Sequence, residues 1–272
     1  EIAVHAAAVQ RVGMAFFVLE TMLGELVNRM LAGYARVPFA AIQSKRLDEW
    51  QKQRIAEAAQ VLYVDRLRID ASRLVPGPAG RQDIVRGCRT IEAMRRAVKR
   101  MLLDLPIGLI VVDHLQKIEP PFPCPIFERV TQASNGLADL AQEFGIPVVA
   151  MLQLNEGADA PTATDTRGGQ EIGNDCQALV LLDRPPMRRP VKERDQMDPA
   201  QREEAAMIVA LHGSGGTGTI PMRYAGETMR WYQVADRDEQ LPLAAPEQRV
   251  AHGGHAPVAA DYEGVEWERN DD

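Results

Sequence analysis

The sequence predicts an α/β domain whose sheet is mostly parallel, is flanked by helices and is followed by a terminal set of antiparallel strands. Short apolar runs alternate with longer amphipathic segments along most of the chain, which indicates parallel strands joined by helical crossovers. Near the end, strand-like runs at 207–211, 220–224 and 229–232 follow one another closely enough to form hairpins.

Length and composition fit a packed protein. The chain has 272 residues, which is enough for one large domain or two small ones. Of these residues 46% are hydrophobic and 25% charged, a composition that allows a packed core. A wholly disordered chain, a collagen and a disulfide scaffold are excluded. The widely spaced cysteines, without a CxxC pair, are typical of a reducing compartment. We expect no membrane span, because no apolar run approaches about 18 residues.

The formal net charge of −7 comes from the residues after 234, and the residues before them are neutral overall. Global charge therefore argues neither for nor against a nucleic-acid partner. From 235 onward the sequence is acidic and rich in Pro, Ala and Gly, with few residues that could form a core. We therefore expect a folded domain at 1–234 and a disordered tail at 235–272.

The first half of the chain alternates strand and helix patterns. Residues 12–19 (VGMAFFVL) form a continuous apolar run that predicts a buried strand, and a helix is expected after it at 20–32. A second helix fits 47–60, and a short strand fits 67–70. A Pro/Gly-rich loop (VPGPAG, 75–80) then interrupts the pattern.

The second half begins with an Arg-rich segment that predicts a helix near 83–103. Residues 108–113 (GLIVVD) give the clearest strand pattern, and 146–152 (IPVVAML) is expected to be its partner. Between them lies an amphipathic helix. Its apolar face consists of Ile126, Val130, Leu137, Leu140 and Phe144. A polar loop then leads to a further strand at 178–182.

Polar residues stand at the ends of the predicted strands. Glu20 and Asp113 each end an apolar run, and Gln153 follows another. Ligands of open α/β sheets bind beyond the carboxyl ends of the strands, where carboxylates can hold Mg²⁺ or orient water and an amide can bind a terminal phosphate. Alternatively, the acids cap the next turn or helix and Gln153 is an ordinary loop amide.

Other polar features are weaker candidates. The run Gly213–Gly218 (GSGGTG) precedes a strand pattern rather than a helix, which favours a hairpin turn over a phosphate loop. A basic cluster could contact phosphates, although a solvated helix face or a subunit interface is favoured. It comprises Arg81, Arg86, Arg89, Arg95, Arg96, Lys99 and Arg100. His114 adjoins Asp113, but the histidines lack the spacing of metal ligands.

Three blocks resemble the C-terminal motor domain of DnaB-type replicative helicases, which are hexameric RecA-like ATPases. They are 108–120 (GLIVVDHLQKIEP), 137–155 (LADLAQEFGIPVVAMLQLN) and 165–184 (DTRGGQEIGNDCQALVLLDR). The family's strand-end Asp matches Asp113, with His114 in place of its Tyr, and its Gln matches Gln153. The family's catalytic glutamate matches Glu20. The resemblance extends from Ala3 to about Tyr232.

The resemblance implies a role for each of these positions. Glu20 would polarise the attacking water, Asp113 would hold Mg²⁺, and Gln153 would report the γ-phosphate to a DNA-binding loop. Arg184 matches an Arg near the nucleotide. The loop at 156–170 would face a DNA channel, where Arg167 is the residue available to meet a phosphate.

The resemblance also implies a function: ATP hydrolysis, with Mg²⁺ as cofactor, coupled to translocation on single-stranded DNA. The expected partners are further copies of the chain in a hexamer and a replication loader or primase. The implied setting is the cytoplasmic replication machinery of bacterial or phage type.

The sequence departs from the family in having no GxxxxGK[ST] motif, the family's phosphate-binding loop, among its 272 residues. In the resemblance, residues 1–10 match the helix that follows this loop. We expect this chain alone to have little affinity for ATP and an unpaired sheet edge where the strand leading into that loop would lie. Two other functions stay open: a non-catalytic RecA-like module that binds DNA or a helicase, and a RecA/RadA-type recombinase ATPase.

Overall fold

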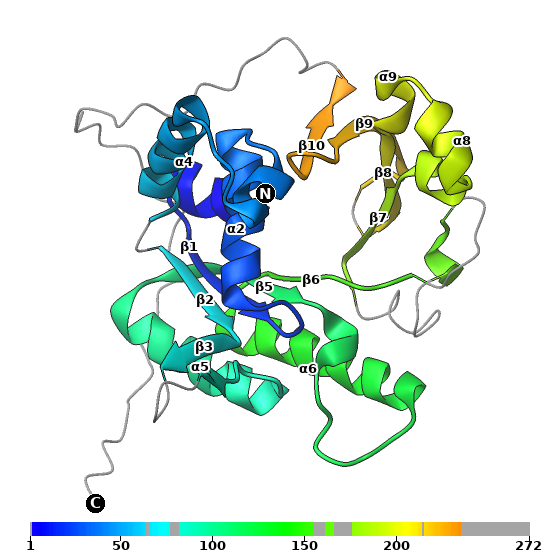
Figure 1. Ribbon diagram of the computed structural model, residues 1–272. Coiled ribbons are helices and arrows are strands. Elements are labelled where there is room, and N and C mark those ends of the chain that lie inside the picture. The colour runs from blue at the N-terminus through cyan, green and yellow to red at the C-terminus, as the bar shows by residue number, and fades with distance from the viewer. Residues whose placement is uncertain are drawn as a thin grey trace, which may run out of the picture. The chain divides into compact units, whose positions relative to one another are not determined.

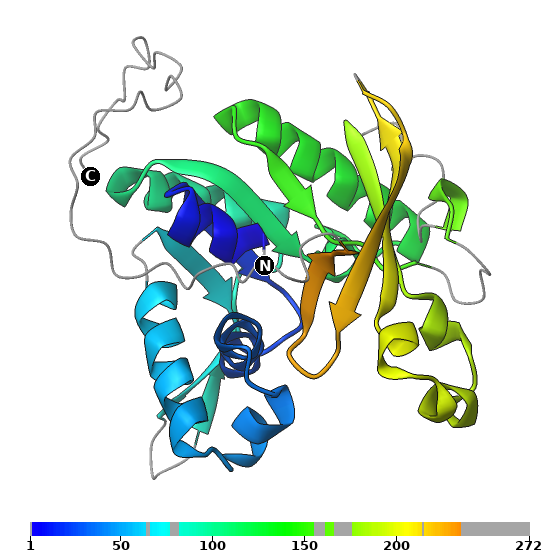
Figure 2. The same ribbon diagram turned by 90° about the horizontal axis from the view of Figure 1, so that it is seen from above.

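The computed structural model describes residues 2–63, 66–76, 82–154, 161–165, 176–213 and 215–234. These residues form one parallel four-stranded sheet, one antiparallel four-stranded sheet and a two-stranded hairpin, together with helices (Figures 1 and 2). The predicted fold class is therefore confirmed. The predicted tail at 235–272 lies outside the described residues.

The elements follow one another in the order expected for an α/β domain. The strands are β1 (Gly13–Val18), β2 (Leu67–Ala71), β3 (Arg73–Pro76), β4 (Gln82–Val85), β5 (Ile107–Asp113), β6 (Val148–Ala150), β7 (Ala178–Asp183), β8 (Glu204–His212), β9 (Gly218–Ala225) and β10 (Arg230–Gln233). The helices are α1 (Ile2–Val4), η1 (His5–Val9), α2 (Leu23–Ala35), α3 (Phe39–Ser44), α4 (Glu49–Leu62), α5 (Ile91–Asp104), η3 (Leu115–Lys117), α6 (Ile126–Phe144), η4 (Ala163–Asp165), η5 (Pro185–Arg188), α8 (Val191–Gln196) and α9 (Pro199–Arg202). Every predicted strand overlaps an observed one.

The parallel sheet has the strand order β2-β1-β5-β6. All six residues of β1 are buried, because this central strand is covered on both faces. Side chains alternate along the strand, so Ala15 and Phe17 belong to one apolar cluster and Met14 and Phe16 to another. The first cluster includes side chains of α5 and α6, two helices that lie together on one side of the sheet in Figure 1. The second includes side chains of α1 and η1.

The antiparallel sheet has the order β10-β9-β8-β7. The glycine-rich run at 213–218 follows β8 and ends at the first residue of β9; Ser214 lies outside the described residues. Because β8 and β9 pair antiparallel, the predicted hairpin is confirmed. Within the described residues, β6 pairs with β5 alone and β7 with β8 alone. Each therefore has an open edge, and both carry half-exposed apolar side chains such as Val149 and Leu182.

The start predicted for the Arg-rich helix is wrong. Residues 82–85 form β4, which pairs antiparallel with β3, and α5 begins only after Thr90, whose side chain accepts a hydrogen bond from the Ala93 N–H at 3.1 Å. Gly87 lies so close to Asp70 that an added Cβ would stand 2.6 Å from its carboxylate. Only glycine, which has no Cβ, allows the chain to approach Asp70 this closely before α5. Short helices α3, α8 and α9 were also not predicted.

The Asp48 side chain forms the N-cap of α4. It accepts a hydrogen bond from the Gln51 N–H at 2.8 Å, and the Gln51 side chain accepts one from the Asp48 N–H at 3.1 Å. We expect Asp48→Ala to lower the free energy of unfolding by about 1 kcal/mol, because it removes the side-chain acceptor of the Gln51 N–H. Asp48→Asn should retain most of the stability. Urea denaturation measures both, and equal losses in the two variants would contradict the assignment of the cap.

Candidate active site

The carboxyl ends of β1, β5 and β6 bring the three predicted strand-end residues to one edge of the parallel sheet. Val18 is the register partner of Asp113, and the Leu19 N–H donates to the Asp113 carbonyl at 2.7 Å. Glu20 therefore comes directly after the point where β1 meets the end of β5. On the other side, the Met151 N–H donates to the Val112 carbonyl at 2.9 Å, and Gln153 lies just beyond.

Glu20 is held between two nitrogen atoms. His114 Nδ1 lies 3.3 Å from Glu20 Oε2, and Lys117 Nζ lies 3.1 Å from Glu20 Oε1. The side chain is 49% exposed, so water can reach it. The hydrogen bond from Lys117 holds the pKa of Glu20 below its usual value, although partial burial opposes this effect. Glu20 is therefore an ionised carboxylate at neutral pH that is open to solvent.

Asp113 has a different environment. Its side chain is 27% exposed, and burial raises the pKa of Asp113 above its usual value, while the His114 charge opposes this and the Glu20 charge adds to it. The two acids at this edge thus have pKa values shifted in opposite directions, and perturbed pKa values are common at functional sites. A bound cation would offset the cost of burying the Asp113 charge.

A magnesium ion fits this carboxylate. Among the described residues, no group of three or more His, Cys, Asp or Glu side chains could form a metal cage by itself. Mg²⁺ commonly uses only one or two protein carboxylates and completes its shell with water and substrate phosphates. Asp113, partly buried at a strand end, is suited to such a site.

The short helix η3 joins the parts of this edge. Gln116, which is buried, donates from Nε2 to the Gln153 carbonyl at 3.1 Å and accepts from the Gln153 N–H at 3.3 Å through Oε1. Lys117 reaches Glu20 from the same helix. Sequence reasoning missed both contacts, although Gln116 stands inside one of the blocks that resemble the helicases and Lys117 directly follows it.

Two further site residues were predicted, Arg184 and Arg167. No hydrogen bond or ion pair between described residues joins Arg184 to the group at the strand ends. Arg184 follows β7 in the antiparallel sheet, and its guanidinium carbon lies 3.9 Å from the centre of the Tyr224 ring. Burial lowers the pKa of Arg184. Tyr224 in turn contacts Trp231, with 5.1 Å between ring centres. Arg167 lies outside the described residues.

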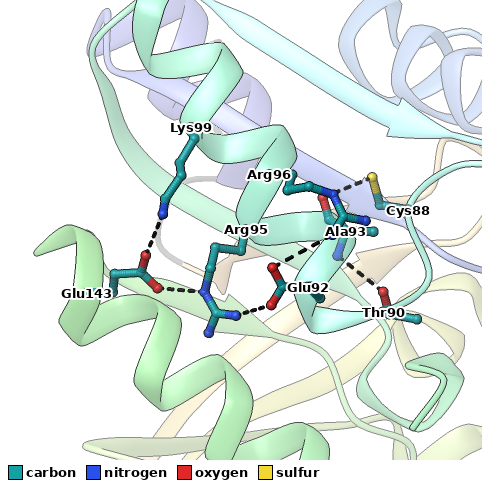
Figure 3. Close-up of polar contacts among 8 residues, drawn as sticks. All are labelled: Cys88, Thr90, Glu92, Ala93, Arg95, Arg96, Lys99 and Glu143. Carbon is teal, nitrogen blue, oxygen red and sulfur yellow. Dashed lines mark hydrogen bonds and ion pairs between the residues drawn. The ribbon is translucent and has the colours of Figure 1, made fainter. Parts of the chain in front are cut away.

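The predicted basic cluster lies on and before α5, and its member Arg81 lies outside the described residues. Several of its other members are engaged within the fold, as Figure 3 shows for Arg95, Arg96 and Lys99. Arg95 Nε lies 2.6 Å and Lys99 Nζ 3.2 Å from the carboxylate of Glu143 on α6. Arg89 donates to the Leu19 carbonyl at 2.8 Å and pairs with Glu119 at 2.6 Å. These contacts favour a packing role for the cluster over phosphate binding.

Open α/β sheets, those of nucleotide-binding domains among them, bind ligands beyond the carboxyl ends of their strands, which is where Glu20 and Asp113 lie. The family model of the DnaB-like helicase C-terminal domain matches residues 1–233. The chain therefore belongs to the family of DnaB-like helicase C-terminal domains. Within the described residues, no helix is both long and apolar enough to cross a membrane.

Curated relatives are similar over most of this chain. The replicative DNA helicase DnaB of Mycobacterium intracellulare is 28% identical over 236 residues, which cover 83% of this chain and 36% of the relative. The DnaB of Leifsonia xyli is 26% identical over 226 residues, covering 81% of this chain and 45% of the relative. The chain thus spans less than half the length of these two proteins.

Solved structures have the same fold. One of them, an ATPase domain, superimposes with a TM-score of 0.70 at 16% identity and covers 85% of this chain and 79% of that one. A DnaB-like replicative helicase studied with primase gives a TM-score of 0.66 at 15% identity, covering 82% of this chain and 51% of that one. The fold is therefore that of RecA-like DnaB ATPase domains.

Proposed function

We propose that the chain is the motor domain of an ATP-dependent DNA helicase that acts in replication and couples ATP hydrolysis to translocation on single-stranded DNA. The observation that carries this proposal is the meeting of Glu20, Asp113 and Gln153 at one edge of the parallel sheet, in a chain of the DnaB-like family. Family membership favours the helicase over a RecA/RadA-type recombinase.

In this proposal the strand-end residues act on the terminal phosphate of ATP. Glu20, ionised and open to water, would accept a proton from the attacking water molecule and orient it. Asp113 would hold Mg²⁺, which supplies positive charge to the phosphate oxygens when it is bound. The Gln153 amide would donate a hydrogen bond to the γ-phosphate.

Three further assignments belong to the same proposal. Arg184 would contact the nucleotide with a guanidinium that already lies against an aromatic ring. Arg167 would meet a DNA phosphate. The whole protein would form a homo-hexamer on single-stranded DNA, with a replication loader or primase as partner, in the cytoplasmic replication machinery. The relatives' names support the role in DNA replication, and the interaction of the second structural neighbour with primase supports primase as the partner.

We expect the full-length gene product to unwind a forked DNA duplex in the presence of ATP and Mg²⁺ and to hydrolyse ATP faster when single-stranded DNA is added. Strand unwinding and phosphate release measure the two activities, and a strand-exchange assay runs beside them. Strand exchange without unwinding would identify a recombinase. An absence of ATP turnover in the full-length protein would favour a non-catalytic module and refute the proposal.

A further inference from the structure

We propose that Lys117 is a positioning residue for the reaction, which holds the Glu20 carboxylate in the orientation that hydrolysis requires. This inference rests on the proposed function, because it concerns the group that would handle the attacking water. It adds a residue that the resemblance to the helicases did not assign. The observation behind it is that the two oxygens of Glu20 have separate nitrogen partners.

Glu20 needs such support because of its place in the chain. It comes after the last residue of β1, in a bend that precedes α2, and its side chain is half exposed. A glutamate in this setting is free to adopt several rotamers. Contacts to Oε1 from Lys117 and to Oε2 from His114 together select one orientation.

Lys117 can act in this way because η3 is itself fixed at several points. The Leu115 side chain is buried in the core, and the Leu115 N–H donates to the Met151 carbonyl at 2.9 Å. Gln116 exchanges two hydrogen bonds with the backbone of Gln153. The helix that carries Lys117 is thus fixed against the end of β6. Lys117 therefore contacts Glu20 from a fixed position.

The contact leaves the carboxylate able to work. An ionised carboxylate has about four lone-pair sites, and each oxygen of Glu20 has a single nitrogen atom as its ion-pair partner. A water molecule can therefore still donate to Glu20. Both side chains of the ion pair are exposed to water, 41% for Lys117 and 49% for Glu20. The pair therefore contributes little to the free energy of unfolding. Its main effect is then on geometry, where small displacements of a catalytic group lower rates strongly.

The test compares ATP hydrolysis by the full-length protein and its variants. We expect Lys117→Met to lower kcat about ten-fold, because the carboxylate loses its orientation, while KM changes less than about two-fold. Lys117→Arg should restore most of kcat, since its guanidinium can reach the same oxygen. In a Glu20→Gln background, Lys117→Met should lower the residual rate no further, because it acts through Glu20.

Lys99→Met is the matched control. Lys99 also pairs with a glutamate, Glu143, at 3.2 Å (Figure 3), and is 50% exposed. It lies within helix α5 rather than after a strand of the parallel sheet. We expect its kcat to equal that of the wild type. Equal kcat values for Lys117→Met and wild type would overturn the inference and leave the proposed function intact. A wild-type protein without ATP turnover would refute both.

Discussion

Glu20→Gln should reduce ATP turnover by the full-length protein by about 10²- to 10⁴-fold, the usual contribution of a general base. Glutamine has almost the same shape as glutamate and can keep a hydrogen bond to Lys117, but it cannot accept a proton from water. Asp113, the proposed magnesium ligand, is unchanged in this variant. We therefore expect ATP to bind with nearly the same dissociation constant while hydrolysis is lost.

The control for this prediction is Glu57→Gln on α4. The Glu57 side chain is 42% exposed and pairs with Arg54 at 3.5 Å, so it matches Glu20 in exposure and in having a cationic neighbour. Its substitution should leave kcat unchanged. Phosphate release under saturating ATP measures kcat, and fluorescence of a bound nucleotide analogue measures affinity. A Glu20→Gln variant with wild-type turnover would rule out Glu20 as the group that handles the water.

The main features of the sheet edge could be predicted from the sequence for a simple reason. In a parallel sheet the carboxyl ends of the strands lie at one edge, so polar residues that end apolar runs must come together there. Glu20, Asp113 and Gln153 were found in this way. The registers of β1 against β5 and of β5 against β6 place the ends of these strands side by side, as expected. Their chemical roles are still predictions, because they depend on a bound nucleotide.

The supporting contacts could not be predicted, because they depend on the path of the chain after a strand has ended. Lys117 reaches Glu20 only because η3 folds back over the edge, and no periodicity in the sequence indicates that turn. For Arg95 and Lys99 the charges were evident in the sequence, but the residue that pairs with them was not. The charges of the basic cluster favoured a solvated helix face or a subunit interface and left phosphate binding open, yet the acid that pairs with Arg95 and Lys99, Glu143, comes from α6, far along the chain.

The β3–β4 hairpin shows the same limit in the fold. Its segment lies next to an Arg-rich run whose composition favours a helix, and local propensity alone extended that helix to residue 83. The observed start at Ile91 follows from the cap of Thr90 and from hydrogen bonds between Cys88 and Asp70, which hold the preceding chain extended. Both are contacts of particular side chains rather than patterns of hydrophobicity.

Phe17→Ala should cause the largest loss of stability, about 3 to 5 kcal/mol in the free energy of unfolding. Phe17 has no exposed surface and lies in β1, the buried strand that ends next to Glu20. Its ring packs in the same cluster as Met94 of α5 and Leu140 of α6. Removing it leaves a cavity that the sheet on one side and two helices on the other cannot fill without moving.

Phe122→Ala is the matched control, because the Phe122 side chain is 78% exposed and precedes α6. This variant should change the free energy of unfolding by less than about 0.5 kcal/mol. Urea denaturation followed by far-ultraviolet circular dichroism measures both variants against the unsubstituted chain. Equal midpoints for Phe17→Ala and Phe122→Ala would mean that β1 is not the centre of the core. The arrangement of Glu20 beside Asp113, which depends on the position of β1, would then lose its structural basis.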